Sequence, residues 1–194
     1  MMAIWTPDYY NGPTHWAFIK ANFYHINDQG QKYLTYEDVI KRAEQMYVHR
    51  DWYAYLYGAD GQTCTDELVD LKVRQNPKHF ARYSAADIED IKRYSRGKVV
   101  FDCSGFVHSI YDAPDMTAAK IISICSNVTT DLASGVEASV LYKKGHIGQD
   151  VGHGCFIDIA SELDTFRLKV IREYDWEKSG MLTKYCDYTG ATND

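Results

Sequence analysis

One cysteine stands where its side chain could act as a nucleophile. Cys103 follows an extended apolar run, Val99–Phe101, and begins a segment with helical character. The first turn of a helix carries unpaired N–H groups and a partial positive charge, and both stabilise a thiolate. Such placement can lower a cysteine pKa from about 8.5 into the range of about 3.5–7.5. The small residues Ser104 and Gly105 would let a substrate carbonyl approach the backbone. We therefore interpret Cys103 as a nucleophile, although a free cysteine is more often a small buried hydrophobe.

A histidine and an aspartate further along the chain could complete the chemistry. His146 follows a predicted helix and opens an apolar run, and Asp158 lies in a second run, 155–160, after the turn Gly152–Gly154. A histidine beside a thiol serves as the base, and a third polar side chain orients its ring. The starts of two hairpin strands do not face each other, so we expect this pair to meet only if the strands slide or share one end of the sheet. A strand-end histidine bonded to backbone and a surface aspartate are the structural alternatives.

These residues carry a resemblance to a known family. The runs Asp102–Gly105 and Gly145–Gly148, followed by a polar residue in an apolar strand, resemble the NlpC-type cysteine peptidases. These are papain-like enzymes that cut the peptide part of bacterial cell walls. The resemblance implies that Cys103 is the nucleophile, His146 the base and Asp158 the orienting group.

Two further motifs extend the resemblance. Tyr55–Ala59 resembles the family's Tyr-x-aromatic-Gly-Gly element, whose first tyrosine lies near the thiol, and this implies such a position for Tyr55. A core position is the alternative, because the chain holds 16 tyrosines. Trp176, Gly180 and Leu182 resemble an ending common in phage-type members.

The chain departs from the family pattern in three places. A long helical segment separates Tyr55 from Cys103, whereas many relatives have the two close together. Leu141–Lys144 replaces the usual Pro-Gly-Asp turn before the histidine strand. Gln149 and Asp150 stand where that strand is usually apolar and aromatic.

The resemblance runs from about Tyr36 to Tyr188 and implies an α+β, papain-like NlpC-type fold, with N-terminal helices packed on a C-terminal antiparallel sheet. We expect an irregular, aromatic-rich extension over residues 1–34 and the peptidase domain over 35–194. Capping residues predict helices that begin at Thr35, Thr65 and Ser84. Alternation and apolar runs predict the strands. The remaining expected elements are a helix from Cys103 to about Tyr111, a helical stretch over about 116–142 broken near Asn127 or Gly135, and strands over 146–151, 155–160 and 166–171.

Composition restricts the possible partners. The chain has 194 residues, of which 45% are hydrophobic, and a net charge of −6, which gives no support for nucleic-acid binding. No apolar run approaches the length of a membrane-spanning helix. The five cysteines form no zinc-type pair, and His146, His153 and Cys155 match no familiar zinc spacing. We expect His108 to pack or to reach solvent. The N-terminus lacks the features of a signal peptide, so we expect synthesis in the cytoplasm and action on the wall after release or delivery.

The resemblance implies acyl transfer to water, with no metal or organic cofactor. Cys103 would attack an amide of a peptidoglycan stem peptide, and its N–H, with the Tyr55 hydroxyl, would hold the oxyanion. We expect Tyr57, Ser104 and Trp176 along the substrate groove, although Trp176 could equally be a core residue. An endopeptidase or N-acetylmuramoyl-L-alanine amidase of a phage lysin is the favoured interpretation. A papain-like acyltransferase or deamidase on another substrate and a catalytically retired binding module remain open, and the sequence does not indicate an oligomeric state.

Overall fold

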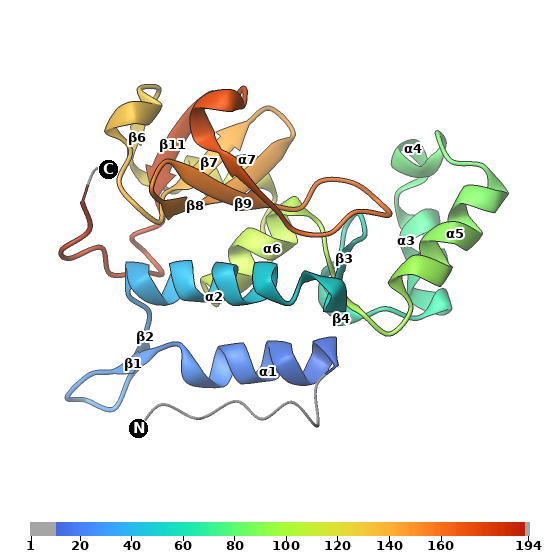
Figure 1. Ribbon diagram of the computed structural model, residues 1–194, viewed down its shortest axis with the longest axis horizontal. Coiled ribbons are helices and arrows are strands. Elements are labelled where there is room, and N and C mark those ends of the chain that lie inside the picture. Colours follow the sequence, from blue (N-terminus) through green and yellow to red (C-terminus); the bar gives the residue numbers. More distant parts are fainter. Residues whose placement is uncertain (1–10, 193–194) are drawn as a thin grey trace.

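Side-chain caps begin the predicted helices where the sequence places them. In the computed structural model, which describes residues 11–192, the hydroxyls of Thr35, Thr65 and Ser84 accept N–H bonds from the residue three positions on. These hydroxyls satisfy N–H groups that have no partner inside the helix. Figure 1 shows the resulting arrangement of helices and strands. The helices are α1 (Gly12–Asn22), α2 (Tyr36–Val48), α3 (Asp66–Gln75), α4 (Pro77–Phe80), α5 (Ala85–Ser95), α6 (Cys103–Ile110) and α7 (Ala118–Ser123), with short 3-10 turns η2 (Arg50–Trp52), η3 (Leu132–Ser134) and η4 (Ile171–Glu173).

Three sheets accompany these helices. The largest has six strands in the order β10-β9-β8-β7-β11-β6, and all of its neighbouring strands are antiparallel. A three-stranded sheet has the order β3-β5-β4, in which β3 runs parallel to β5, and β1 and β2 form a short hairpin. The expected α+β class is confirmed. The strands are β1 (His25–Ile26), β2 (Lys32–Tyr33), β3 (Tyr53–Tyr55), β4 (Asp60–Thr63), β5 (Val99–Phe101), β6 (Ser126–Thr129), β7 (Val140–Lys143), β8 (His146–Gly152), β9 (Cys155–Asp158), β10 (Arg167–Val170) and β11 (Lys178–Met181).

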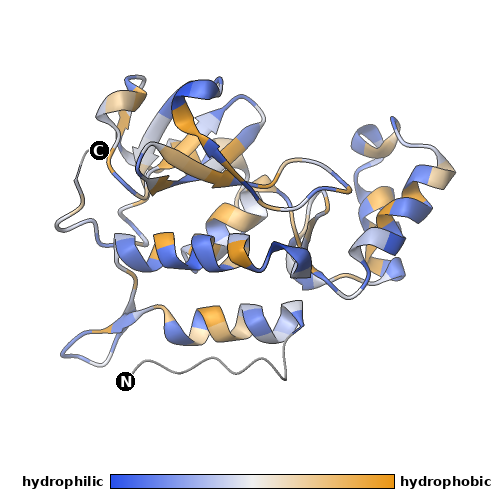
Figure 2. Ribbon diagram, in the orientation of Figure 1, coloured by the Kyte–Doolittle hydropathy of each residue, from blue (hydrophilic) through white to orange (hydrophobic). Residues whose placement is uncertain are grey.

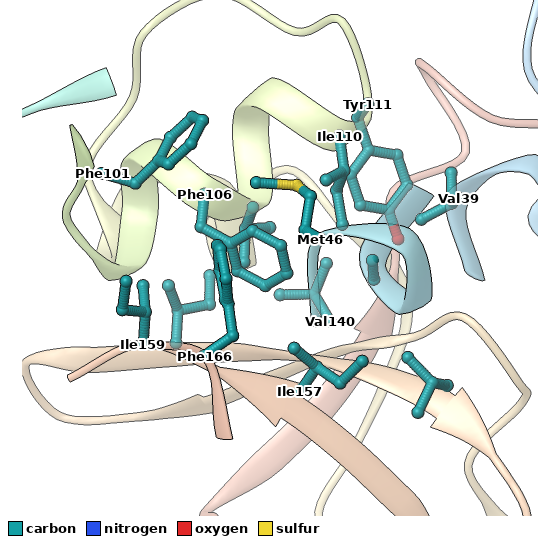
Figure 3. Packing of buried hydrophobic residues seen from close by; sticks show 14 of the residues in the cluster. Val39, Met46, Phe101, Phe106, Ile110, Tyr111, Val140, Ile157, Ile159 and Phe166 are labelled. Carbon is teal, nitrogen blue, oxygen red and sulfur yellow. The ribbon is translucent and has the colours of Figure 1, made fainter. Parts of the chain in front are cut away.

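The main core lies between the six-stranded sheet and helices α2 and α6. Phe106 of α6, Met46 of α2 and Ile157 of β9 point into it and are fully or almost fully buried (Figure 3). Bands of apolar and polar residues alternate along α2, as Figure 2 shows, because its apolar positions recur at helical spacing. Burial of this apolar surface fixes α6, and with it Cys103, against the sheet.

A second, smaller core lies under α3, α4 and α5, which form a helical lobe at one end of the molecule (Figure 1). Val69, Phe80 and Ile91 of the lobe pack on Leu56 and Val100 at the three-stranded sheet. Both faces of this sheet are therefore covered, one by the lobe and one by the main core.

The structure corrects two expectations about secondary structure. The long helical stretch predicted for residues 116–142 is wrong: α7 is the one α-helix there, with the short 3-10 turn η3 further on, and the chain also forms β6 and β7, so His146 follows a strand. The reason is tertiary, because β11, which the sequence did not predict, lies between β6 and β7 and pairs with both. Residues 12–22, expected to be irregular, form α1, which Asn11 caps. The aromatic residues Trp5, Tyr9 and Tyr10 of the expected extension lie outside the described residues.

No helix within residues 11–192 combines the length and the apolar character that crossing a membrane requires.

Candidate active site

The start of α6 is held in place by one aspartate. Asp102 caps the helix: its Oδ1 accepts the Gly105 N–H at 2.6 Å and the Ser104 hydroxyl at 2.9 Å. Its Oδ2 accepts the Gly58 N–H at 3.0 Å. Asp102 therefore ties the end of β5 and the start of α6 to the loop after Tyr55. Cys103 is the first residue of α6 and is half-buried.

The three-stranded sheet brings Tyr55 to this helix. Tyr55 is the register partner of Phe101, two residues before Cys103, and is 5% exposed. The thiol is near enough that its charge would raise the Tyr55 pKa, although burial is the larger cause of that rise. The helices that lie between Tyr55 and Cys103 in the sequence do not separate these residues in space. The inserted segment leaves and rejoins the three-stranded sheet at one place. There the Cys64 N–H donates to Lys98 O at 2.8 Å, and the Gly97 N–H donates to Cys64 O at 3.0 Å.

The environment of the thiol favours its protonated form. Burial raises the pKa of Cys103 to about 12, and the charge of Asp102 adds to the increase. Hydrogen bonding from the N–H groups of Ile147, Ser104 and Cys103 itself acts in the opposite direction but is the smaller effect. The expected lowering of this pKa by the helix terminus is therefore wrong for this structure. The Ile147 interaction nevertheless places the thiol at the start of β8, next to His146 in the chain.

The imidazole of His146 is oriented by Asp158, and Asp158 is in turn bound by Arg167. His146 Nε2 lies 2.7 Å from Asp158 Oδ2, and the same carboxylate accepts bonds from Arg167 Nε at 2.8 Å and Nη2 at 2.5 Å. Burial raises the pKa of Asp158, but the hydrogen bonds from His146 and Arg167 outweigh it and hold the pKa below its usual value. An ionised Asp158 accepts the Nε2 proton, which leaves the Nδ1 lone pair free to act as a base.

Strand register explains why His146 and Asp158 meet. Asp158 is the last residue of β9, and the end of the second strand of a hairpin lies beside the start of the first, so no sliding is needed. Gly148 provides the space: a Cβ there would lie 3.0 Å from the Trp176 ring and 3.3 Å from the Asp158 Cβ. Arg167 is the register partner of Asp158 on β10. Sequence reasoning missed Arg167, although its polar position in the alternating strand 166–171 was a usable signal.

Trp176 lies behind the imidazole. Its ring is parallel to that of His146, with centroids 5.4 Å apart and an interplanar angle of 10°. It is 6% exposed and belongs to a buried cluster with Leu141, Phe156 and Ile171. Trp176 therefore supports the orientation of His146, and the expectation that it lines the substrate groove is replaced by this core position.

A cleft of about 400 Å³ opens at the thiol. Tyr57 is 37% exposed at its edge and stacks on His79 with ring centroids 3.8 Å apart. Ser104 lines the cleft, but its hydroxyl is bonded to Asp102. A larger hollow of about 830 Å³ between β2 and the C-terminal segment contains none of the candidate residues. The residues that line the cleft with Cys103 include Tyr57, Gly58, Ala59, Asp60, Ser104, Asp115, Tyr142 and Gly145.

Gln149 and Asp150, the two polar residues that depart from the family pattern, form hydrogen bonds with backbone groups. The Gln149 side-chain amide is buried and donates to the carbonyls of Ala138 at 2.7 Å and Asp150 at 3.0 Å. The Asp150 carboxylate accepts the Gly152 N–H at 2.8 Å. These bonds satisfy buried polar groups near the β8–β9 turn and give both residues a structural role.

Comparisons with known proteins find distant structural similarity. No protein-family model matches the chain, and no curated protein matches it in sequence. Among solved structures, it is similar to NlpC2 from Trichomonas vaginalis, with 15% identity, a TM-score of 0.42 and coverage of 73% of this chain and 44% of that one. It is also similar to NlpC1 from the same organism, with 13% identity, a TM-score of 0.43 and coverage of 74% and 44%. The chain thus spans less than half the length of either protein.

Proposed function

We propose that this protein is a cysteine hydrolase that cleaves an amide bond in the stem peptide of bacterial peptidoglycan. The observation that carries the proposal is the junction of α6 and β8. There a helix-terminal cysteine receives the Ile147 N–H, and the adjacent His146 is oriented by an ionised carboxylate. The resemblance of the motifs around Cys103 and His146 to the NlpC-type peptidases supports the choice of substrate.

The raised pKa of Cys103 shapes the proposed mechanism. Because the resting thiol is protonated, His146 Nδ1 takes the proton as sulfur attacks the amide carbonyl carbon. The Cys103 N–H, with the Tyr55 hydroxyl, stabilises the oxyanion that forms. His146 then donates its proton to the leaving amine, and a thioester remains on Cys103. Water, deprotonated by His146, hydrolyses the thioester and releases the carboxylic acid.

Asp158 and Arg167 support the base in different ways. The Asp158 carboxylate stabilises the imidazolium that forms during attack. Arg167 withdraws part of that negative charge, because it binds both carboxylate oxygens. The arrangement therefore orients the imidazole, and the raised pKa of Cys103 disfavours a preformed ion pair between the thiol and His146.

Substrate recognition is expected to depend on shape and hydrogen bonds. The net charge of −6 does not favour attraction to an anionic wall. The cleft offers Tyr57 and Tyr142, whose rings can pack on aliphatic stem residues while their hydroxyls select the register. The resemblance at Trp176, Gly180 and Leu182 supports a phage-type lysin as the setting.

Digestion of purified sacculi tests the proposal. We expect the protein to release free amino groups without new reducing sugar ends, and mass spectrometry of the fragments would identify the bond. Cys103→Ser and His146→Ala should abolish release, while Cys155→Ser, which alters another half-buried cysteine, should not. Reducing ends would indicate a glycosidase. Absence of both products on every wall type would favour the acyltransferase, the deamidase or the retired binding module.

A further inference from the structure

Three potential metal ligands meet at one wall of the cleft. They are Asp60 at the start of β4, His108 near the end of α6 and Asp115 in the loop before α7. One ligand atom from each, two carboxylate oxygens and an imidazole nitrogen, lies within 4.8 Å of the other two. All three residues line a polar hollow, and Asp60 and Asp115 also line the cleft that holds Cys103. The proposed hydrolytic mechanism uses none of the three.

Close packing of α6 on β4 creates the group. Gly105 and His108 are one helical turn apart and lie on the same face of α6. A Cβ on Gly105 would lie only 2.1 Å from the Ala59 carbonyl oxygen, so a side chain there would force the helix away. Glycine at this position therefore allows the approach that brings His108 to Asp60.

The burial of His108 is a second, independent indication that this group of residues binds an ion. The residue is 4% exposed, and its buried Nε2 has no hydrogen-bond partner. Asp115 Oδ1 lies 3.4 Å from that nitrogen, at ion-pair distance, on a side chain that is 82% exposed. Two ligands about 2.0–2.1 Å from a tetrahedral ion are separated by about 3.3 Å. The separation of these two atoms is therefore close to that of two ligands of one ion.

The charges around the group suit a cation. Two carboxylates face the imidazole, and the Gln62 side-chain amide donates to Asp60 and holds it. The cationic side chain that lines the same hollow is Lys20, whose Nζ lies over the Trp16 ring, 5.1 Å from its centroid. Asp112, also at this hollow, is paired with Arg42 and Lys32.

We propose that Asp60, His108 and Asp115 bind one divalent transition-metal ion of the zinc type, with water completing the coordination. Imidazole with carboxylate oxygens is a donor set that such ions accept, whereas calcium prefers six to eight oxygens. The ion would link β4, α6 and the loop before α7, and so fix one wall of the cleft that holds Cys103. The site is structural, and its binding does not depend on the proposed hydrolytic activity.

Zinc titration of the full chain in a Cys103→Ser background tests the site, because this variant removes the thiol that could also bind zinc. We expect one equivalent of Zn²⁺ by calorimetry and a higher unfolding temperature with zinc. Co²⁺ should give a visible spectrum without sulfur-to-metal charge transfer. Asp115→Asn alters an exposed side chain and should weaken binding at least about tenfold. His108→Gln should do the same, and Asp90→Asn, the charge-matched control on α5, should leave the affinity unchanged.

Three results would overturn the proposal. The first is the absence of zinc binding up to millimolar concentration. The second is binding of equal affinity in the Asp115→Asn and His108→Gln variants. The third is zinc binding to the wild-type chain but not to Cys103→Ser, which would place the ion on the catalytic thiol.

Discussion

At the scale of single residues, charged neighbours control the pKa of the Cys103 thiol and the hydrogen bonding of the His146 imidazole. Asp102 organises the start of α6 yet raises the pKa of Cys103. Arg167 fixes Asp158 yet competes with His146 for its charge. Asp102 therefore improves the geometry of Cys103 but opposes ionisation of its thiol, whereas Arg167 favours ionisation of Asp158 while it competes with His146 for the carboxylate charge.

Replacing Asp102 by asparagine should make Cys103 more reactive. The asparagine side-chain oxygen can still accept the Gly105 N–H, but the negative charge beside the thiol is gone, so the Cys103 pKa should fall. Below that pKa the thiolate fraction rises tenfold for each unit by which the pKa falls, and we expect alkylation about threefold to tenfold faster at pH 8. Iodoacetamide labelling, followed for each cysteine by peptide mass spectrometry, measures this rate. Asp90→Asn is the control, and an unchanged or slower Cys103 rate in Asp102→Asn would contradict the expectation.

Replacing Asp158 by asparagine should cost both turnover and stability. Arg167, 24% exposed, would keep only the more distant Asp164 carboxylate at 3.9 Å, and we expect a loss of about 2 kcal/mol in the free energy of unfolding, less than for a fully buried pair. Because the Asp158 pKa is depressed on folding, its stabilisation is present above the unfolded pKa of about 3.9 and is lost as the pH falls through the folded pKa. Urea denaturation should therefore show the difference from wild type at pH 7 and a smaller one at acid pH.

Asp175→Asn provides the matched control for that measurement. Asp175 pairs with Lys143 at 2.6 Å, but its side chain is 79% exposed, so this variant should change stability far less than Asp158→Asn. Equal losses in the Asp158 and Asp175 variants would show that the buried carboxylate makes no special contribution.

At the scale of elements, the contact between α6 and β4 sets the position of Cys103. Glycine is normally a poor residue for a helix interior, and its replacement by alanine usually stabilises a helix by about 1 kcal/mol. At Gly105 the new methyl group would lie 2.1 Å from the Ala59 carbonyl oxygen. The packing therefore requires a residue that helix propensity disfavours.

Gly105→Ala should consequently destabilise the protein, reversing the usual sign. We expect a loss of about 2–3 kcal/mol from overpacking, with sacculus hydrolysis reduced because α6 and its cysteine must shift. Chemical denaturation measures the stability, and Ser109→Ala, a substitution on the same helix, is the control. A gain in stability for Gly105→Ala would show that α6 is free to move away from β4.

At the scale of the whole molecule, two cores of unequal size hold two parts of the structure. The helical lobe of α3, α4 and α5 has its own cluster around Val69, Phe80 and Ile91, while the main core joins α2 and α6 to the six-stranded sheet. Regions with separate cores often open in separate steps. The lobe also supplies His79, which supports Tyr57 at the edge of the cleft.

Val69→Ala should therefore loosen the lobe in preference to the rest. Val69 is fully buried, and we expect a loss of about 1–2 kcal/mol that appears mainly in the lobe. Native-state hydrogen exchange should show faster exchange in α3 and α5, with the amides of β8 unchanged. Ile147→Ala, in the main core, is the comparison and should accelerate exchange throughout. Uniform acceleration in Val69→Ala would mean that the two cores unfold as one unit.

The sequence by itself determined the features that depend on short-range chemistry. Helix starts at Thr35, Thr65 and Ser84 follow from capping, and the hairpin of β8 and β9 follows from apolar runs around a glycine turn. Cys103 at a helix terminus could be placed for the same reason, because a strand-to-helix switch is visible in a few residues.

The tertiary structure decided everything that depends on distant partners. The segments 126–129 and 140–143 became strands instead of helix because β11 pairs with β6 and β7 across a long sequence separation. The thiol pKa rose because burial, which no local motif reveals, outweighs the N–H groups at the start of α6. Arg167 joined Asp158, and His108 met Asp60 and Asp115, because strand register and helix packing set those distances. Chain spacing carries no information about such contacts until the sheet is assembled and the helices have packed against it.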